Sequence, residues 1–318
     1  ETLAQVETYI EERPDSALNV LQGMDKGELS GMEEKAKHAL LLSMAMDKNY
    51  IDRTDFDVLQ PAIDFYEDHG SATDKLRTYY YQGRIYQNAG NDAAAMESFV
   101  NSLDMGSESN DNLTKARILV AQSNIYYSLM KWEKVCDVNI EAANYYNELG
   151  RTNNYVYCLL RCIGGYIQSN NFDKAKDLLG KCYQYTENLP ELLISEIYSY
   201  HLLYSVAANN FESVPLIIGE YKNKVSEENI DYLTVAGAYA DIGAYDKAED
   251  MLVRINTKSL EDNNKTLKYY TTLIRIYRHK GDYRKVYESY LKFNELNDSI
   301  LFSIFESDTQ FIEERHAL

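Results

Sequence analysis

The chain has few of the residues that break helices. Only 4 of its 318 residues are proline and 15 are glycine, whereas Leu, Ala, Tyr, Lys and Glu are frequent. Strands and turn-rich folds depend on such breakers, so their scarcity favours an all-α fold.

Positive charge is also in short supply. Lys and Arg total 32 against 50 Asp and Glu, which gives a formal net charge of -18 at pH 7. A surface of this sign repels a phosphate backbone, so we expect no nucleic acid binding through this chain.

The sequence has no apolar run of the roughly 20 residues that cross a bilayer. It begins at Glu1 without an initiator Met or a charged-then-apolar leader. We expect that a leader was removed or was omitted, and that any membrane attachment comes only through flanking segments.

The sequence contains four cysteines, Cys136, Cys158, Cys162 and Cys182, and no Cys-x-x-Cys pair. A zinc or redox site would require such a pair, so we expect buried thiols that act as small apolar side chains. A disulfide in an oxidising compartment stays an alternative.

Motifs for catalysis and cofactor binding are missing. No Gly-x-x-x-x-Gly-Lys, Gly-x-Gly-x-x-Gly or Gly-x-Ser-x-Gly segment occurs, and the five histidines have no metal-ligand spacing. We therefore expect no enzyme activity, no cofactor and no metal. A hydrolase site assembled from distant carboxylates is the alternative.

The sequence does contain a repeated motif, in which an aromatic residue stands three positions before a small residue. The small residues of the motif and of its weaker first copy are separated by 40, 40, 39, 34 and 38 residues. They are Ala95, Val135, Ala175, Val214, Ala248 and Val286. A period of this length predicts paired helices in a solenoid, an architecture that builds long binding surfaces.

The clearest repeat gives the family. Gly83, Tyr86, Gly90, Ala95 and Phe99 lie at offsets of 0, 3, 7, 12 and 16, and the sequence here resembles the tetratricopeptide repeat (TPR) family. The resemblance implies a right-handed superhelical solenoid in which small residues mark the helix crossing and Gly90 ends the first helix in a left-handed conformation.

We expect one continuous array over residues 1–318, made of about eight antiparallel helix hairpins with a period of 34 to 40 residues. Residues 1–70 form divergent N-terminal hairpins and residues 76–293 form six TPR-like repeats. Residues 294–318 form a helix that caps the last hairpin or continues it. The third and sixth repeats carry Ile163 and Ile274 at the small position, which predicts wider helix crossings.

The last of these segments has its own pattern. Six residues predict one apolar face on the C-terminal helix: Ile300, Leu301, Ile304, Phe305, Phe311 and Ile312. The spacing of Leu301, Ile304, Asp308 and Phe311 is also that of a short coiled-coil seam, which is the alternative to capping.

A second resemblance covers roughly residues 5 to 105. It rests on four segments: Glu12–Leu18, Ala39–Leu42 followed by Asp47–Tyr50, Phe65–Gly70 and Tyr79–Tyr86. They resemble the sensor half of helical-repeat regulators and lipoproteins from Bacteroidetes. The resemblance implies a periplasmic or outer-surface location, anchored to a membrane in the full-length protein. A cytoplasmic location is the alternative.

The positions that line the concave face in the TPR family carry basic residues at two places. The candidate peptide-binding groove comprises Arg77, Tyr80, Arg84, Asn88, Arg117, Asn124 and Tyr127. A second basic patch comprises Lys268, Arg275, Arg278 and His279. The middle repeats offer mostly apolar residues, among them Leu160, Leu203 and Leu233.

Arginine presents a planar fork to carboxylates, so the predicted groove suits an acidic peptide or a chain terminus. In the alternative, the arginines pair with nearby Glu and Asp of the same chain. We thus expect a non-enzymatic module, the ligand-sensing part of a bacterial signalling or transcription regulator, that binds a protein or peptide partner. A structural adaptor with an unoccupied groove is the rival hypothesis.

Overall fold

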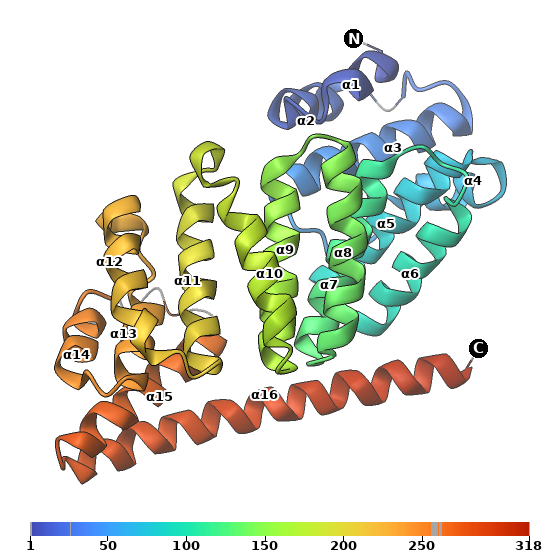
Figure 1. Ribbon diagram of the computed structural model, residues 1–318. Coiled ribbons are helices and arrows are strands. Elements are labelled where there is room, and N and C mark those ends of the chain that lie inside the picture. The colour runs from blue at the N-terminus through green and yellow to red at the C-terminus, as the bar shows by residue number, and fades with distance from the viewer. Residues whose placement is uncertain (1, 26, 256–259, 261–262, 318) are drawn as a thin grey trace. The chain divides into compact units, whose positions relative to one another are not determined.

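The computed structural model describes residues 2–25, 27–255, 260 and 263–317, with side chains up to Phe305. Every regular element in these ranges is a helix (Figure 1). The chain divides into two compact units, Glu1–Ile125 with Ser307–Leu318, and Tyr126–Glu306. The all-α prediction is confirmed. The prediction of one continuous array stays a prediction.

The first unit contains seven α-helices, the last of which runs three residues into the second unit, and also the end of the C-terminal helix from Ser307 onward. The seven helices are α1 (Leu3–Tyr9), α2 (Pro14–Gly23), α3 (Gly31–Lys48), α4 (Gln60–His69), α5 (Ala72–Asn88), α6 (Asp92–Met105) and α7 (Asn112–Ser128). The two hairpins expected before residue 70 are α1 with α2 and α3 with α4. Capping boxes at Thr2 and Ser71 start α1 and α5.

The second unit continues the alternation. Its α-helices are α8 (Trp132–Glu148), α9 (Thr152–Gln168), α10 (Phe172–Tyr183), α11 (Glu191–Ala207), α12 (Val214–Lys224), α13 (Tyr232–Asp241), α14 (Tyr245–Val253), α15 (Asn263–His279) and α16 (Tyr283–Ala317). Three short 3₁₀ turns are η1 (Thr186–Asn188), η2 (Phe211–Ser213) and η3 (Glu227–Asn229).

Packing within the hairpins follows the steric logic of the repeat. Gly83 on α5 lies so close to α6 that a Cβ atom there would be 2.5 Å from Phe99 Cε1. Ala95 and Phe99 are fully buried, as are the small residues Val135, Ala175, Val214 and Ala248. Five of the six small residues of the repeated motif are thus buried, as a close contact between paired helices requires, and Val286 is half-buried.

The turns inside five of the six TPR-like repeats share one backbone geometry. Gly90, Asn170, Asn209, Gly243 and Gly281 have φ between 57° and 78°. In each case the next residue donates its N–H to a carbonyl five positions back, as Asn91 does to Tyr86 at 2.9 Å. This is the left-handed helix end expected at Gly90.

One repeat forms this turn without a suitable residue. Met130 takes φ 54°, and the N–H of Lys131 still bonds to Tyr126 O at 2.8 Å. Side chains with a Cβ atom are strained in the left-handed region. We expect Met130→Gly to raise the free energy of unfolding by about 1 kcal/mol, because the exposed side chain loses little packing.

Urea-induced unfolding of Met130→Gly measures this gain. Gly90→Ala is the matched reverse change, and we expect it to destabilise by about 1 kcal/mol. An unfolding midpoint for Met130→Gly at or below that of the wild type would contradict the strain argument.

The C-terminal segment continues the last repeat. Helix α16 is a single helix of 35 residues, so the second helix of the last repeat continues without a break. Ile300 and Ile304 are half-buried, whereas Leu301 and Phe305 are exposed, and the single apolar face of this helix stays a prediction. Side chains at Asp308, Phe311 and Ile312 lie outside the described set.

Candidate functional site

The predicted arginines of the first unit all pair with carboxylates. Arg77 donates from Nε to Asp111 Oδ2 at 2.6 Å and from Nη1 to Glu7 Oε1 at 2.7 Å. Arg84 donates from Nε to Asp47 Oδ1 at 3.0 Å. These contacts agree with the alternative interpretation, in which the arginines form ion pairs with Glu and Asp of the same chain.

Arg117 makes the strongest of these pairs. Its two terminal nitrogens donate to both carboxylate oxygens of Glu11, at 2.9 and 2.7 Å, and Lys48 Nζ adds a third contact at 2.8 Å. Burial alone would raise the pKa of the Glu11 carboxyl, but the bonds to Arg117 and Lys48 outweigh it and lower this pKa to about 2.

The other predicted groove residues have separate environments. Tyr80 is buried, 4.8 Å from the Tyr81 ring between centroids. Asn88 donates from Nδ2 to Arg53 O at 3.2 Å, and Asn124 is exposed. Tyr127 belongs to the second unit, where its ring lies 4.2 Å from Arg161 Cζ.

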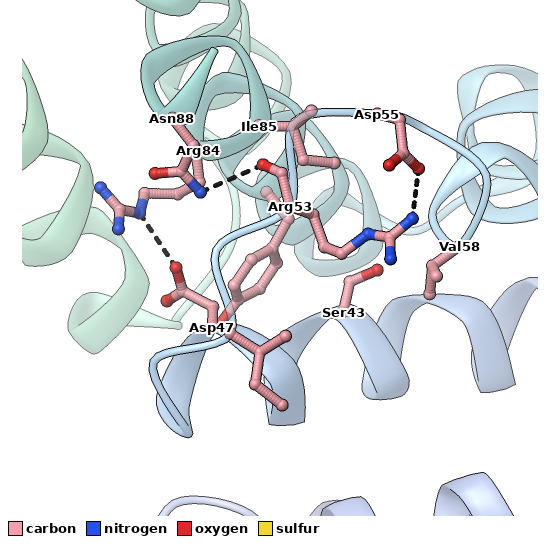
Figure 2. Close-up of a pocket in the computed structure, with 10 residues that line it drawn as sticks. Ser43, Asp47, Arg53, Asp55, Val58, Arg84, Ile85 and Asn88 are labelled. Atoms are coloured by element: carbon pink, nitrogen blue, oxygen red, sulfur yellow. Dashed lines mark hydrogen bonds and ion pairs between the residues drawn. The ribbon is translucent and has the colours of Figure 1, made fainter. Parts of the chain in front are cut away.

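The cavity beside Arg84 is small. Figure 2 shows Arg84 paired with Asp47, Asn88 bonded to the Arg53 carbonyl, and Arg53 paired with Asp55 around it. Its volume of about 20 Å³ is close to that needed for a single water molecule. A peptide side chain does not fit there without movement of these residues.

Residues of the second basic patch also contact other residues of the same chain. Lys268 Nζ donates to Thr234 Oγ1 at 2.8 Å, Arg275 pairs with Asp241, and His279 stacks on Tyr245 at 4.3 Å. Arg278 is exposed. The structure therefore uses at least three of the four residues to join α15 to α13 and α14.

A large hollow lies in the second unit. It is an open groove of about 810 Å³, lined by α9, α11, the segment 228–234 that leads into α13, the end of α14, and the start of α15. This volume falls in the range of small-ligand and peptide sites.

Aromatic and aliphatic side chains make up half of the residues that line the groove. Tyr157 and Leu160 come from α9, Leu192, Tyr200 and Leu203 from α11. Leu192 and Leu203 are among the exposed apolar side chains of the unit, so both are accessible to a ligand. They are eleven residues apart, or about 16 Å along the helix.

Charges of both signs lie among these apolar groups. Arg161 rests on the Tyr127 ring, and Glu196 lies in the same groove. Burial raises the pKa of the Glu196 carboxyl, and the charges of Arg161 and Lys265 only partly offset this. Burial likewise raises the pKa of the Tyr200 phenol, which therefore stays protonated as a hydrogen-bond donor.

A buried tyrosine holds one wall of the groove in place. The Tyr221 hydroxyl accepts from the N–H of Asp231 at 2.9 Å and contacts Ser195 Oγ at 2.5 Å. Ser195 in turn donates to the carbonyl of Asn229 at 2.6 Å. Glu191 at the start of α11 accepts from Asn229 Nδ2 at 2.7 Å. Segment 226–231 is thus tied to α11.

We expect Tyr221→Phe to destabilise the second unit by about 1 to 3 kcal/mol, because the N–H of Asp231 loses its buried acceptor. Urea-induced unfolding measures the change. Tyr239→Phe is the control, since its hydroxyl has no hydrogen bond within the described residues, and we expect a change below about 0.5 kcal/mol. Equal losses of unfolding free energy in the two variants would contradict a stabilising role for the hydrogen bonds of the Tyr221 hydroxyl.

The sequence indicated only part of this groove. Leu160, Leu203 and Leu233 were expected on the concave face, but Tyr157, Arg161 and Tyr200 were not singled out. These three occupy the same helix faces as the leucines. The mixture of tyrosine, leucine and charge at those positions is the signal that could have found the site.

The four cysteines are free thiols and all are buried. Burial raises the pKa of the Cys136 thiol to about 12, so it is unreactive at neutral pH. Among the described residues, no group of His, Cys, Asp and Glu is arranged to hold a metal ion.

No protein-family model and no curated protein sequence matches the chain. The architecture is that of an all-helical, TPR-like protein, and solved structures share it. The apo form of RapI has a TM-score of 0.63 at 15% identity, covering 99% of this chain and 96% of that one.

Two further structures contain bound molecules. A Rap protein complexed with competence and sporulation factor has a TM-score of 0.61 at 15% identity, with coverage of 99% and 92%. NprR in complex with its cognate peptide NprX has a TM-score of 0.59 at 13% identity, with coverage of 99% and 96%. Identities this low establish a common fold.

Membrane insertion through the described helices is not indicated. Within the part of the chain that the structure describes, no helix combines the length and the apolar character that crossing a bilayer requires.

Proposed function

We propose that this chain is a non-enzymatic binding module that holds a short peptide segment in the groove of its second unit. The observation that carries the proposal is the groove itself, about 810 Å³ in volume and lined by aromatic, aliphatic and charged side chains of three successive first helices of hairpins. Apolar walls with a few oriented polar groups are typical of ligand sites.

The likeness in fold supports a peptide as the ligand. NprR was solved with its cognate peptide NprX, and a Rap protein with competence and sporulation factor. The distance of about 16 Å between Leu192 and Leu203 matches about five residues of extended chain. A segment of that length contacts α9, α11 and the 228–234 wall at once.

In this proposal the first unit does not bind the peptide. The sequence had instead predicted a binding groove at Arg77, Arg84 and Arg117. Their ion pairs with Asp111, Asp47 and Glu11 support a structural role for the three arginines. The groove prediction at these residues stays a prediction, and binding by the Arg84→Ala variant tests it.

A regulatory role for the module follows from the same likeness, because RapI and NprR are the structures it resembles and NprR is described as a quorum sensor. The export and membrane anchoring implied by the Bacteroidetes resemblance stay predictions. Fractionation of cells that express the full-length gene product tests them.

Selection from a displayed library of random ten-residue peptides tests the function. We expect the wild-type chain to enrich peptides that bind saturably, and Leu203→Glu to enrich none of them, because a carboxylate then stands in the apolar wall. Leu216→Glu is the control, since this exposed leucine of α12 is not part of the groove.

Three outcomes decide between the hypotheses. Enrichment by the wild type, Leu216→Glu and Arg84→Ala, but not by Leu203→Glu, supports the groove of the second unit. Loss of binding in Arg84→Ala instead supports the arginine groove. No enrichment by any variant favours the structural adaptor.

A further inference from the structure

Helix α16 carries a set of large apolar side chains that are exposed in the structure. Its seven large exposed side chains have relative accessibilities between 49% and 72%. They are Tyr283, Tyr287, Tyr290, Leu291, Leu301, Phe302 and Phe305. A soluble chain seldom leaves so many large apolar groups on one helix without a partner.

These residues form one stripe. At 100° per residue, Tyr283, Tyr287, Leu301 and Phe305 fall within about 40° of one another around the helix axis. Val286, Phe293, Ile300 and Ile304, the less exposed residues, lie on the adjacent flank of the helix, about 60° to 140° away around its axis. The inward face thus belongs to the fold and the outward stripe does not.

The stripe has a two-fold symmetric spacing. Asn294 lies at its centre, with Tyr290 and Asp298 four residues away on either side, Tyr287 and Leu301 seven residues away, and Tyr283 and Phe305 eleven residues away. Steps of four and three residues are those of a helix–helix seam.

We propose that this stripe is the surface on which a second copy of the same chain docks, with the two α16 helices antiparallel about Asn294. In that arrangement Tyr287 packs on Leu301 of the second copy, Tyr283 packs on its Phe305, and the two Asn294 amides face each other. The contact is isologous and closes as a two-fold dimer. It extends over about 33 Å of helix.

Charge favours the antiparallel orientation. There, the Tyr290 hydroxyl meets Asp298 of the second copy, whereas Lys292 lies on the opposite side of the helix beside Glu295 of its own chain. A parallel pair would place Asp298 against Asp298 inside the seam, where like charges repel. The proposal is independent of the peptide groove.

Light scattering coupled to size-exclusion chromatography tests the dimer on the full chain. We expect twice the monomer mass for the wild type at about 100 µM and the monomer mass for Tyr287→Glu with Leu301→Glu. Leu216→Glu, an equally polar change at an exposed leucine of α12, keeps the dimer. A wild-type monomer at this concentration, or a dimer unchanged by the double substitution, overturns the proposal.

Cysteine cross-linking tests the orientation, because the four native thiols are buried. We expect Tyr287→Cys and Leu301→Cys chains to form a disulfide only when they are mixed, and Asn294→Cys to form one with itself. Efficient self-cross-linking of Leu301→Cys alone would overturn the antiparallel arrangement. Circular dichroism of each variant confirms that its helices are intact.

Discussion

Replacing Arg117 by methionine is expected to lower the free energy of unfolding by about 2 to 4 kcal/mol. The change keeps most of the apolar stem but leaves the Glu11 carboxylate with Lys48 as its remaining cationic partner. Removal of one partner from a buried ion pair costs about 3 to 5 kcal/mol. The side chains of Arg117 and Glu11 are 23% and 29% exposed, so we expect a somewhat smaller loss.

Urea-induced unfolding measures this loss, and Lys37→Met is the matched control. Lys37 pairs with Glu7 at 2.8 Å, but both side chains are more than a third exposed, so we expect a loss below about 1 kcal/mol. An equal loss of unfolding free energy in the two variants would contradict a specific stabilising role for the ion pair between Arg117 on α7 and Glu11.

The same pair predicts a pH dependence. The Glu11 carboxyl has a pKa lowered from 4.5 to about 2 in the folded state, so the unfolded chain binds more protons between these values. The stabilisation is fully present above about pH 4.5 and is lost as the pH falls toward 2. We therefore expect the difference between wild type and Arg117→Met to shrink over that interval.

A groove variant is expected to have the largest effect on binding. Truncating both Leu192 and Leu203 to alanine removes two accessible apolar contacts from the wall of α11. At about 1 to 1.5 kcal/mol for each contact, the dissociation constant of a selected peptide should rise about 30- to 150-fold. Isothermal titration calorimetry with that peptide measures the change.

Leu216→Ala is the control for the groove variant. It makes the same truncation at an exposed leucine outside the groove, so we expect an affinity within about two-fold of the wild type. Both groove leucines are partly exposed, so the double variant should keep the unfolding midpoint of the wild type. Unchanged affinity in a folded double variant would contradict the groove.

The hairpins could be predicted because their signals are local. The spacing of Gly83, Ala95 and Phe99 specifies where α5 and α6 meet, and Gly90 specifies the turn between them. Met130 could not be predicted in this way, because methionine has no preference for the left-handed backbone conformation. The period of the neighbouring repeats, rather than the residue type, places that turn.

The ion-pair partners of the arginines could be predicted only in part from the sequence. Arg77 pairs with Asp111, and Arg275 with Asp241, each 34 residues away, which is one repeat period. Such pairs can be found by counting from repeat to repeat. Arg117 and Glu11 are 106 residues apart, and their contact depends on how the divergent first hairpin packs.

The groove depends on a wall that has no repeat signature. Segment 226–231 is fixed by Tyr221, Ser195 and Glu191 through hydrogen bonds between α11, α12 and the segment itself. Hydroxyl and carboxylate groups of this kind occur throughout the chain, so the sequence does not single out these three. Only their placement in the fold shows that they shape a binding surface.

Photo-cross-linking of a selected peptide tests the central claim most directly. A peptide with a photoreactive residue is bound to the wild-type chain, irradiated, and the attachment sites are located by mass spectrometry. The account predicts attachment within α9, α11 and residues 228–234. Attachment confined to α5, α7 or another surface would contradict it.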